Sequence, residues 1–443
     1  MSWIIILFPN QVRKSGPFRL KLYLFVQRTM FYIDSMQKKI IDLLSLSYFR
    51  WSGLVDRTNL HTMSIGHWFL RLKVVMFRAL MALGMKFHRK AEPKAPQHNF
   101  KIVIPSRLSA KGGEFELVFY VPEGYFRASS DYKYPVVVNF HGGGFALGSA
   151  LDDARWASKV MQNVDAVVVS VEYRLAPEHP FSVAQEDGSD AIIYLMSHAK
   201  ELRLDESRIA LSGFSAGGNL AFSVPLMLWD LKNEIGKREL RRFNIDKVAT
   251  TSRTILSHSK TIYKSTEFET TDLEITQKFP DFSIKCIVSF YPPLDFRQPR
   301  AEKRATNPKP EKNLPTFLTN LFDESFMYPR DKVDDSDPYL SPSAASDELL
   351  RTAYPEDIVL FTCEYDMLNA EGVAFGDRLS KQLGKNVYGG VIKDVAHAFD
   401  KMPNPKKYLT TTDECYSTAC AELTKAFATK FDGKRQLHNE LND

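Results

Sequence analysis

From residue 100 onward, short apolar runs alternate with longer helical stretches, and this alternation constrains the fold more than any other feature. Pro135–Phe140 is the clearest run, continuous and apolar like the strands that a parallel sheet buries on both faces. Further strands are predicted at Ile102–Pro105, Phe115–Val121, Ala166–Val171, Ile209–Leu211, Ile284–Phe290, Ile358–Phe361 and Tyr388–Ile392, and helices at Phe181–Ala199, Ala216–Leu231, Asn369–Leu383 and Thr411–Phe431. This order predicts an α/β fold with a mostly parallel central sheet and helices on both faces.

Several segments do not follow the alternation. Apolar residues at helical spacing predict an amphipathic helix at about 64–86, and a polar, proline-containing linker follows it at Glu92–Gln97. Basic residues and a Ser/Thr-rich stretch predict a solvated insertion at about 231–282, and Asp295–Pro315 predicts a second surface loop. The predicted organisation is an extension over 1–50, a helical segment and linker over 51–100, the α/β domain over 101–432 and a polar tail over 433–443.

The amino-terminal 100 residues carry a net charge of +12, whereas the remainder of the chain carries −7. Bulky apolar residues are interleaved with the basic ones over 1–50, which suits a lipid surface or a hydrophobic partner better than nucleic acid. The apolar run Trp3–Phe8 is far shorter than the roughly 20 residues of a membrane span, and its basic residues follow it, unlike those of a secretory signal. Two interpretations of 1–50 remain open: weak contact with a membrane surface, or a poorly ordered extension.

The cysteines Cys286, Cys363, Cys415 and Cys420 form neither a C-x-x-C pair nor a metal-ligand spacing. Two of them lie in apolar strand-like runs, where cysteine usually packs as a small hydrophobic residue. This usage favours a reducing compartment, and we expect a cytoplasmic protein, either free or peripheral at a membrane. No metal, no cofactor and no nucleic-acid partner is expected.

The pentapeptide Gly213-Phe214-Ser215-Ala216-Gly217 lies between a predicted strand and a predicted helix. A G-x-S-x-G motif at a strand-to-helix turn is typical of a nucleophile elbow, which holds a serine hydroxyl above the sheet. The small residues at 213 and 217 let neighbouring backbone approach closely, and the N–H of Ala216 can donate to an oxyanion. The pentapeptide alone is weakly specific, so its position at the turn carries the prediction that Ser215 is a nucleophile.

A second glycine motif, His141-Gly142-Gly143-Gly144, directly follows the predicted strand Pro135–Phe140. Because glycines lack Cβ, several backbone N–H groups can converge there on one point, as an oxyanion hole requires. A phosphate-binding loop would need G-x-G-x-x-G opening a helix, or a lysine after the glycines, and neither is present. We therefore predict an oxyanion-binding loop.

These motifs, together with Tyr173–Pro180 and Asp337–Pro342, resemble the hormone-sensitive-lipase-like (α/β-hydrolase fold-3) family of esterases. The details of the sequence are similar to those of the fungal members of this family. The likeness covers about residues 101–430. It implies an α/β-hydrolase fold with an amino-terminal helical cap formed by about 50–90. It also implies an oxyanion hole in the Gly142, Gly143 and Gly144 run, with Ala216 as a further donor, and a supporting role for His141 rather than that of the base.

The order of catalytic residues in this fold is serine, then an acid, then histidine. Glu364 and Asp366 both follow the predicted strand Ile358–Phe361, so both are candidates for the acid. The resemblance favours Asp366, because the family's acid lies two residues after such a glutamate. An ordinary helix N-cap is the alternative role for Asp366.

Three histidines follow the serine motif in positions worth comparing. His258 lies in the predicted insertion and His438 in the polar tail, whereas His397 follows the last predicted strand. We therefore expect His397 to be the base, Ser215 the nucleophile and Asp366 the residue that orients the imidazole. The expected substrate is a small-molecule carboxylic ester. A non-catalytic small-molecule-binding protein on the same fold, and a membrane-surface interaction protein, remain as alternatives.

Overall fold

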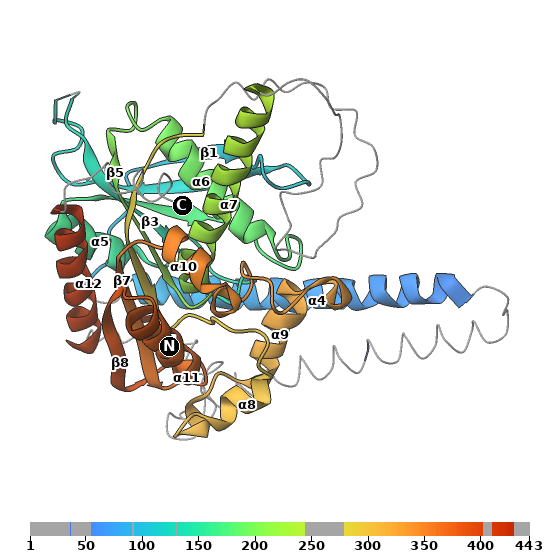
Figure 1. Ribbon diagram of the computed structural model, residues 1–443. Helices are drawn as coiled ribbons and strands as arrows, with labels where there is room; N and C mark the ends of the chain where they lie inside the picture. The colour runs from blue at the N-terminus through green and yellow to red at the C-terminus, as the bar shows by residue number, and fades with distance from the viewer. Residues whose placement is uncertain are drawn as a thin grey trace.

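The computed structural model describes residues 36, 55–90, 93–129, 131–243, 279–401 and 410–428. In this part of the chain one sheet runs in the order β1-β2-β4-β3-β5-β6-β7-β8 (Figure 1). The strands are β1 (Phe100–Pro105), β2 (Glu114–Tyr120), β3 (Tyr134–Phe140), β4 (Val167–Glu172), β5 (Leu204–Phe214), β6 (Ile284–Phe290), β7 (Asp357–Tyr365) and β8 (Asn386–Ala396). The pairs β1–β2 and β2–β4 are antiparallel, and the pairs from β4 through β8 are parallel.

The described residues also form helices, several of which cover the two faces of this sheet. They are α4 (Val55–Lys90), α5 (Ala154–Val164), α6 (Val183–Ser197), α7 (Ala216–Phe243), α8 (Arg300–Ala305), α9 (Thr316–Phe326), α10 (Asp347–Ala353), α11 (Asn369–Asp377) and α12 (Thr410–Ala428). Buried side chains of α5 and α12 belong to the core on one face, and those of α6, α7 and α11 belong to the core on the other (Figure 1). The predicted fold class, a mostly parallel sheet between helical layers, is therefore confirmed.

The strand β3 shows how the sheet is buried on both faces. All of its residues are buried, and successive side chains point to opposite faces. Val136 and Val138 enter the core beneath α6 and α7, while Val137 enters the core beneath α5 and α12. Because β3 and β5 are parallel, the loops after Phe140 and Phe214 meet at the same edge of the sheet.

The structure differs from the sequence prediction in the two irregular segments. Helix α7 continues from Leu231 to Phe243, into the range predicted as an insertion, and residues 244–278 lie outside the described residues. The prediction of a surface loop over Asp295–Pro315 is correct only in part, because most of the segment is exposed or half-buried but it contains α8. Lys303 on α8 is 3% exposed and forms an ion pair with Glu371 of α11, a contact that no local sequence pattern indicates.

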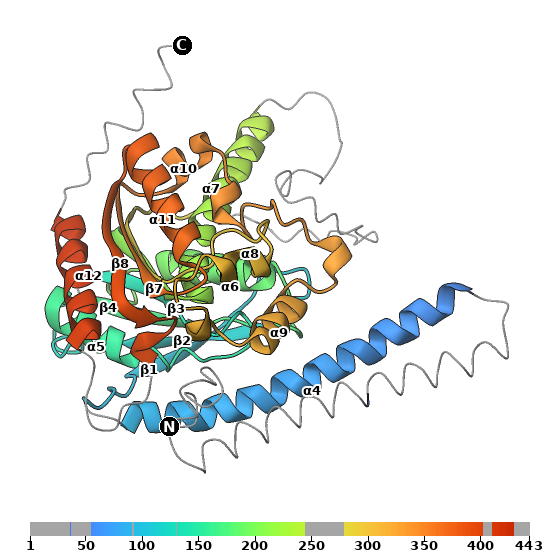
Figure 2. The same cartoon turned by 90° about the horizontal axis from the view of Figure 1, so that it is seen from below.

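The predicted amphipathic helix is the central part of α4. Leu70, Val74 and Phe77 pack against Leu147 of the loop after β3 and against α9. Arg78 of the same helix donates hydrogen bonds to the carbonyl oxygens of Ala146 and Ala176, both at 2.8 Å. Helix α4 therefore lies along one side of the body and continues past α9, as Figure 2 shows. Apart from residue 36, the extension over 1–50 lies outside the described residues, as does the tail over 433–443.

The fully buried Trp156 of α5 offers a test of this packing. Its ring meets those of Phe290 and Tyr416 edge-on, and its Nε1–H donates to Ser212 Oγ at 3.0 Å. We expect Trp156→Ala to lower the free energy of unfolding by about 3–5 kcal/mol, because it leaves a cavity in the core. Trp68→Ala is the matched control, since Trp68 is 60% exposed, and should change that free energy by less than about 0.5 kcal/mol. Urea denaturation measures the free energy of unfolding of both variants. An equal decrease in the two would contradict the burial of Trp156.

Candidate active site

Ser215 lies between the last residue of β5 and the first residue of α7, at the predicted turn. Its backbone φ is 51°, in the left-handed region, which costs a residue other than glycine about 1–3 kcal/mol. The Ser215 N–H donates to the carbonyl oxygen of Phe290 at 2.9 Å, and this bond helps to hold the turn. A Cβ at Gly217 would overlap the carbonyl oxygen of Phe140, so this close contact requires glycine.

The structure brings the other two predicted residues to this serine. His397 Nε2 lies 2.9 Å from Ser215 Oγ, and His397 Nδ1 lies 2.6 Å from Asp366 Oδ2. Both His397 and Asp366 are buried, and Asp366 Oδ1 accepts the N–H of Leu368 at 3.1 Å. The ring of Tyr291 meets the imidazole at an angle of 61°, with 4.8 Å between centroids. In this geometry an imidazole can take the serine proton while the carboxylate holds its tautomer.

Glu364, the other candidate acid, contacts residues other than the imidazole. Glu364 accepts a hydrogen bond from the N–H of Asp394 at 2.9 Å and forms an ion pair with Lys393 at 3.3 Å. The hydrogen bond from Asp394, with the charge of Lys393, holds the pKa of the Glu364 carboxyl below its usual range. His258 and His438 lie outside the described residues. Of the two acids left open by the strand-end pattern, Asp366 is the one that contacts His397.

The glycine loop after β3 lies beside Ser215. Gly143 and Gly144 have φ values of 124° and 61°, which a side chain would disfavour. Within the described residues, the N–H groups of Gly143, Gly144 and Ala216 have no protein acceptor, although the carbonyl oxygen of Gly143 accepts two N–H groups in its own turn. These N–H groups therefore remain free to donate to a substrate oxygen, as the sequence motif predicts.

His141 is buried behind this loop and away from the serine hydroxyl. Its ring stacks on that of Tyr173, with 4.2 Å between centroids and 10° between planes, and its Nδ1 lies 2.8 Å from the carbonyl oxygen of Gly142. The Tyr173 hydroxyl donates to the His141 carbonyl oxygen at 2.7 Å, and burial raises the pKa of Tyr173 above its usual range. This arrangement matches the supporting role that the resemblance implies.

A buried charged cluster next to the site was not indicated by the sequence. Lys401 Nζ lies 2.7 Å from Asp153 Oδ1 and 2.9 Å from Asp400 Oδ2. Burial disfavours the ammonium, but the two carboxylates raise the pKa of Lys401 above its usual range. Asp400 also accepts the hydroxyl of Tyr291, whose ring contacts His397. The cluster thus ties the loop that follows His397 to the body.

Two small cavities reach Ser215 and His397. One, of about 90 Å³, extends toward Met81 and Met85 of α4. The other, of about 30 Å³, extends toward Phe296, Phe326, Met367 and Leu368. Phe322 of α9 lines both cavities and packs directly on Gly144, where a Cβ would overlap its ring. Phe322 therefore stands between the two cavities, above the glycine loop.

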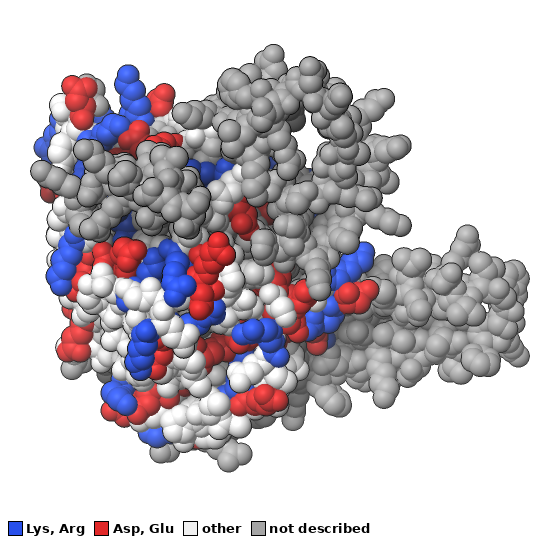
Figure 3. All heavy atoms as spheres, in the orientation of Figure 1, with Lys and Arg blue, Asp and Glu red and all other residues white. Residues whose placement is uncertain are grey.

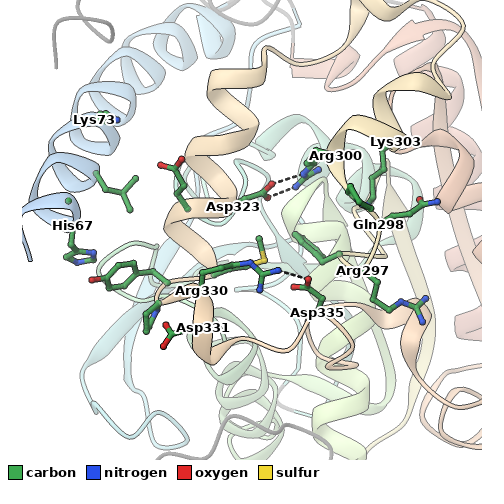
Figure 4. A pocket seen from close by; sticks show the side chains of 18 residues that line it. His67, Lys73, Arg297, Gln298, Arg300, Lys303, Asp323, Arg330, Asp331 and Asp335 are labelled. Carbon is green, nitrogen blue, oxygen red and sulfur yellow. Dashed lines mark hydrogen bonds and ion pairs between the residues drawn. The ribbon is translucent and has the colours of Figure 1, made fainter. Parts of the chain in front are cut away.

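A larger cleft of about 1070 Å³ lies outside the second cavity (Figure 4). His67 and Lys73 of α4 border it on one side, and the segment around α8 borders it on the other. Arg300 and Asp323 line both this cleft and the second cavity, and they form a two-bond ion pair at 2.7 and 2.8 Å. The ion pair therefore separates the outer cleft from the serine.

No group of His, Cys, Asp and Glu side chains in the described ranges is arranged to hold a metal ion. The predicted site residues come instead from four strand ends, those of β3, β5, β7 and β8, at one edge of the sheet. This is where ligands bind in open α/β sheets.

Comparison with known proteins agrees with this fold. A family model described as the alpha/beta hydrolase fold matches residues 137–401. An arylesterase from Saccharolobus solfataricus is 29% identical over 281 residues, covering 62% of this chain and 71% of that protein. Esterase LipI from Mycobacterium tuberculosis is 36% identical over 129 residues, and the match spans only 39% of its length.

A solved structure extends the likeness to three dimensions. The hyperthermophilic esterase from Pyrobaculum calidifontis has a TM-score of 0.56 and 26% identity, covering 80% of this chain and 92% of that one. The family match covers more than half of the chain and includes the glycine loop, Ser215, Asp366 and His397. The chain belongs to this alpha/beta hydrolase family, the fold-3 group of proteins that resemble hormone-sensitive lipase.

Proposed function

We propose that this protein is a carboxylic ester hydrolase that acts through an acyl-enzyme on Ser215. The contact that carries this proposal is the chain of hydrogen bonds from Ser215 Oγ through His397 to Asp366, at 2.9 and 2.6 Å. The names of the relatives, which include esterases and an arylesterase, support the same class of reaction.

The reaction follows from what each group can do. The Ser215 hydroxyl attacks the ester carbonyl carbon as His397 Nε2 takes its proton, and Asp366 stabilises the resulting imidazolium. The N–H groups of Gly143, Gly144 and Ala216 donate to the carbonyl oxygen as it becomes negative, an interaction worth about 2.7–4 kcal/mol per donor. The C–O bond to the alcohol then breaks, and His397 returns the proton to the departing oxygen. Water cleaves the acyl-enzyme by the same steps.

The nucleophile is tested by Ser215→Ala. We expect ester hydrolysis to fall by about 10⁴-fold or more, because the triad acts as a unit, with no loss of folding. Labelling by a fluorophosphonate probe should disappear as well. Ser223→Ala is the matched control, since Ser223 is buried on α7 with no hydrogen-bond partner among the described residues, and it should keep both activity and labelling. Labelling that persists in Ser215→Ala would place the nucleophile elsewhere.

The acid is tested by the pair Asp366→Asn and Glu364→Gln. The amide at 366 would favour the wrong histidine tautomer, so we expect kcat to fall by roughly 10³–10⁴-fold. Glu364→Gln removes a charge that contacts Lys393 and Asp394 rather than the imidazole, so kcat should change less than about tenfold. Steady-state kinetics on a soluble ester decides between them, and the reverse order of effects would reassign the acid.

The two cavities and the outer cleft support a division of the substrate. We propose that the cavity bordered by Met81 and Met85 takes a short apolar half of the ester, because about 90 Å³ holds only a few carbon atoms. The other half of the ester would point toward the Arg300–Asp323 ion pair and the outer cleft beyond it. Phe322, which lies between the cavities, would then limit the length of the apolar half.

Phe322→Ala tests this division. Removing the ring would join the two cavities, so we expect the ratio of kcat/KM for p-nitrophenyl octanoate to that for the acetate to rise by about tenfold. Phe317→Ala is the control on the same helix, because Phe317 packs on Phe77 of α4 and lines neither cavity. A similar rise in the control, or an unchanged ratio in Phe322→Ala, would contradict the assignment.

A further inference from the structure

Helix α4 carries a row of exposed apolar side chains on the face that points away from the body. Trp68, Leu72, Val75 and Leu83 are 60%, 42%, 53% and 50% exposed. Their spacing of four, three and eight residues places them on one side of a helix, and the exposed Ala79 lies between them in the same row. Single exposed apolar side chains are ordinary on a protein surface, but a continuous row marks an interaction surface. We call these five residues the α4 stripe.

Packing against the body does not explain the stripe. The opposite side of α4 is the one that packs, through the buried Phe69, Leu70, Val74 and Phe77. The helix thus has an inner apolar face that is covered and an outer apolar face that is not. The stripe does not belong to a membrane span, because no helix among the described residues is long and apolar enough to cross a bilayer.

The charged side chains of α4 that flank the stripe are of one sign. From Arg57 to Lys90 the sequence contains no aspartate or glutamate. The exposed Arg71 borders the stripe, and the exposed Lys86 and Lys90 continue the row toward the end of the helix. On the face of the body in Figure 3, by contrast, acidic and basic side chains are interspersed. Bulky apolar residues with basic neighbours are typical of helices that lie in the interface of an anionic membrane.

We propose that the α4 stripe binds the surface of an anionic lipid bilayer, with the helix lying in the plane of the interface. Charge favours a lipid bilayer as the partner of the stripe over two alternatives, which are residues 1–50 of this chain and a second copy of α4. Residues 1–50 carry a net charge of +6, and a second copy of α4 would bring another basic helix, so both would be repelled by Arg71, Lys86 and Lys90. The stripe is a different surface from residues 1–50, whose own contact with a membrane stays a prediction.

The position of α4 gives this binding a consequence for the substrate, and this step rests on the proposed esterase activity. The same helix that carries the stripe lines the outer cleft with His67 and Lys73 and the inner cavity with Met81 and Met85. Figure 4 shows α4 as one wall of the cleft. An enzyme held by the stripe would therefore keep its cleft about one helix diameter, roughly 10–12 Å, from the lipid, where apolar esters partition. Esters dissolved in a membrane are the substrate class that this arrangement favours.

The test is vesicle co-sedimentation of the full chain with phosphatidylcholine vesicles, with and without about 30% phosphatidylserine. We expect the wild type to bind the anionic vesicles, and Leu72→Glu/Val75→Glu to bind them at least tenfold more weakly. The matched control is Val103→Glu/Val373→Glu, which places the same charges at exposed valines on β1 and α11, 56% and 41% exposed. This control should bind within twofold of the wild type. Melting temperatures from circular dichroism verify that all forms are folded.

Three outcomes would overturn the proposal. Equal weakening in the two double variants would mean that added negative charge, rather than the stripe, sets the binding. Unchanged binding by Leu72→Glu/Val75→Glu would place any membrane contact elsewhere, such as in residues 1–50. A dimer that this variant dissociates, with no vesicle binding by the wild type, would assign the stripe to a second copy. The assay measures binding rather than ester cleavage, so failure of this proposal can be told apart from failure of the esterase proposal, which Ser215→Ala tests.

Discussion

The close contact between β3 and β5 at their carboxyl ends is the constraint on which the candidate site depends. Gly213 pairs with Phe140 in the parallel register, and Gly217 lies against the carbonyl oxygen of Phe140. A side chain at either glycine would push the start of α7 away from the glycine loop, since each Cβ would overlap backbone atoms. Through this contact, one strand supplies the serine and its neighbour supplies the oxyanion donors, at a single edge of the sheet. The acid and the histidine then need only to follow β7 and β8 to the same edge.

Much of the sheet could be predicted, because a strand that is buried on both faces leaves a continuous apolar run in the sequence. The predicted and observed limits of β6 coincide at Ile284–Phe290, and the predicted fold class is confirmed. The position of His397 was also predictable, since chain order left few histidines to consider. The catalytic roles of Ser215, Asp366 and His397 remain predictions, although the structure places them within hydrogen-bonding distance.

Other features depend on contacts between distant segments and leave no local pattern. Helix α5 was not predicted, although Trp156 in its first turn is fully buried against side chains of β6 and α12. The pairing of Lys303 with Glu371 likewise joins a segment predicted as a surface loop to a helix about 70 residues later in the sequence. Charged residues usually mark exposed loops, so a buried ion pair is where such a prediction fails. The same holds for Lys401, which pairs with its sequence neighbour Asp400 but also with Asp153, from a distant part of the chain.

The backbone at Ser215 bears on the choice between an enzyme and a binding protein. A ligand-binding pocket has no need of a serine with φ of 51°, and that conformation is costly for a residue with a side chain. It also has no need of a buried carboxylate that contacts an imidazole, since each buried polar group must be compensated by its neighbours. Here the strain, the buried carboxylate and the unpaired N–H groups of the glycine loop all converge on one hydroxyl oxygen. That convergence favours chemistry at Ser215 over binding alone, because none of the three would be needed merely to hold a ligand.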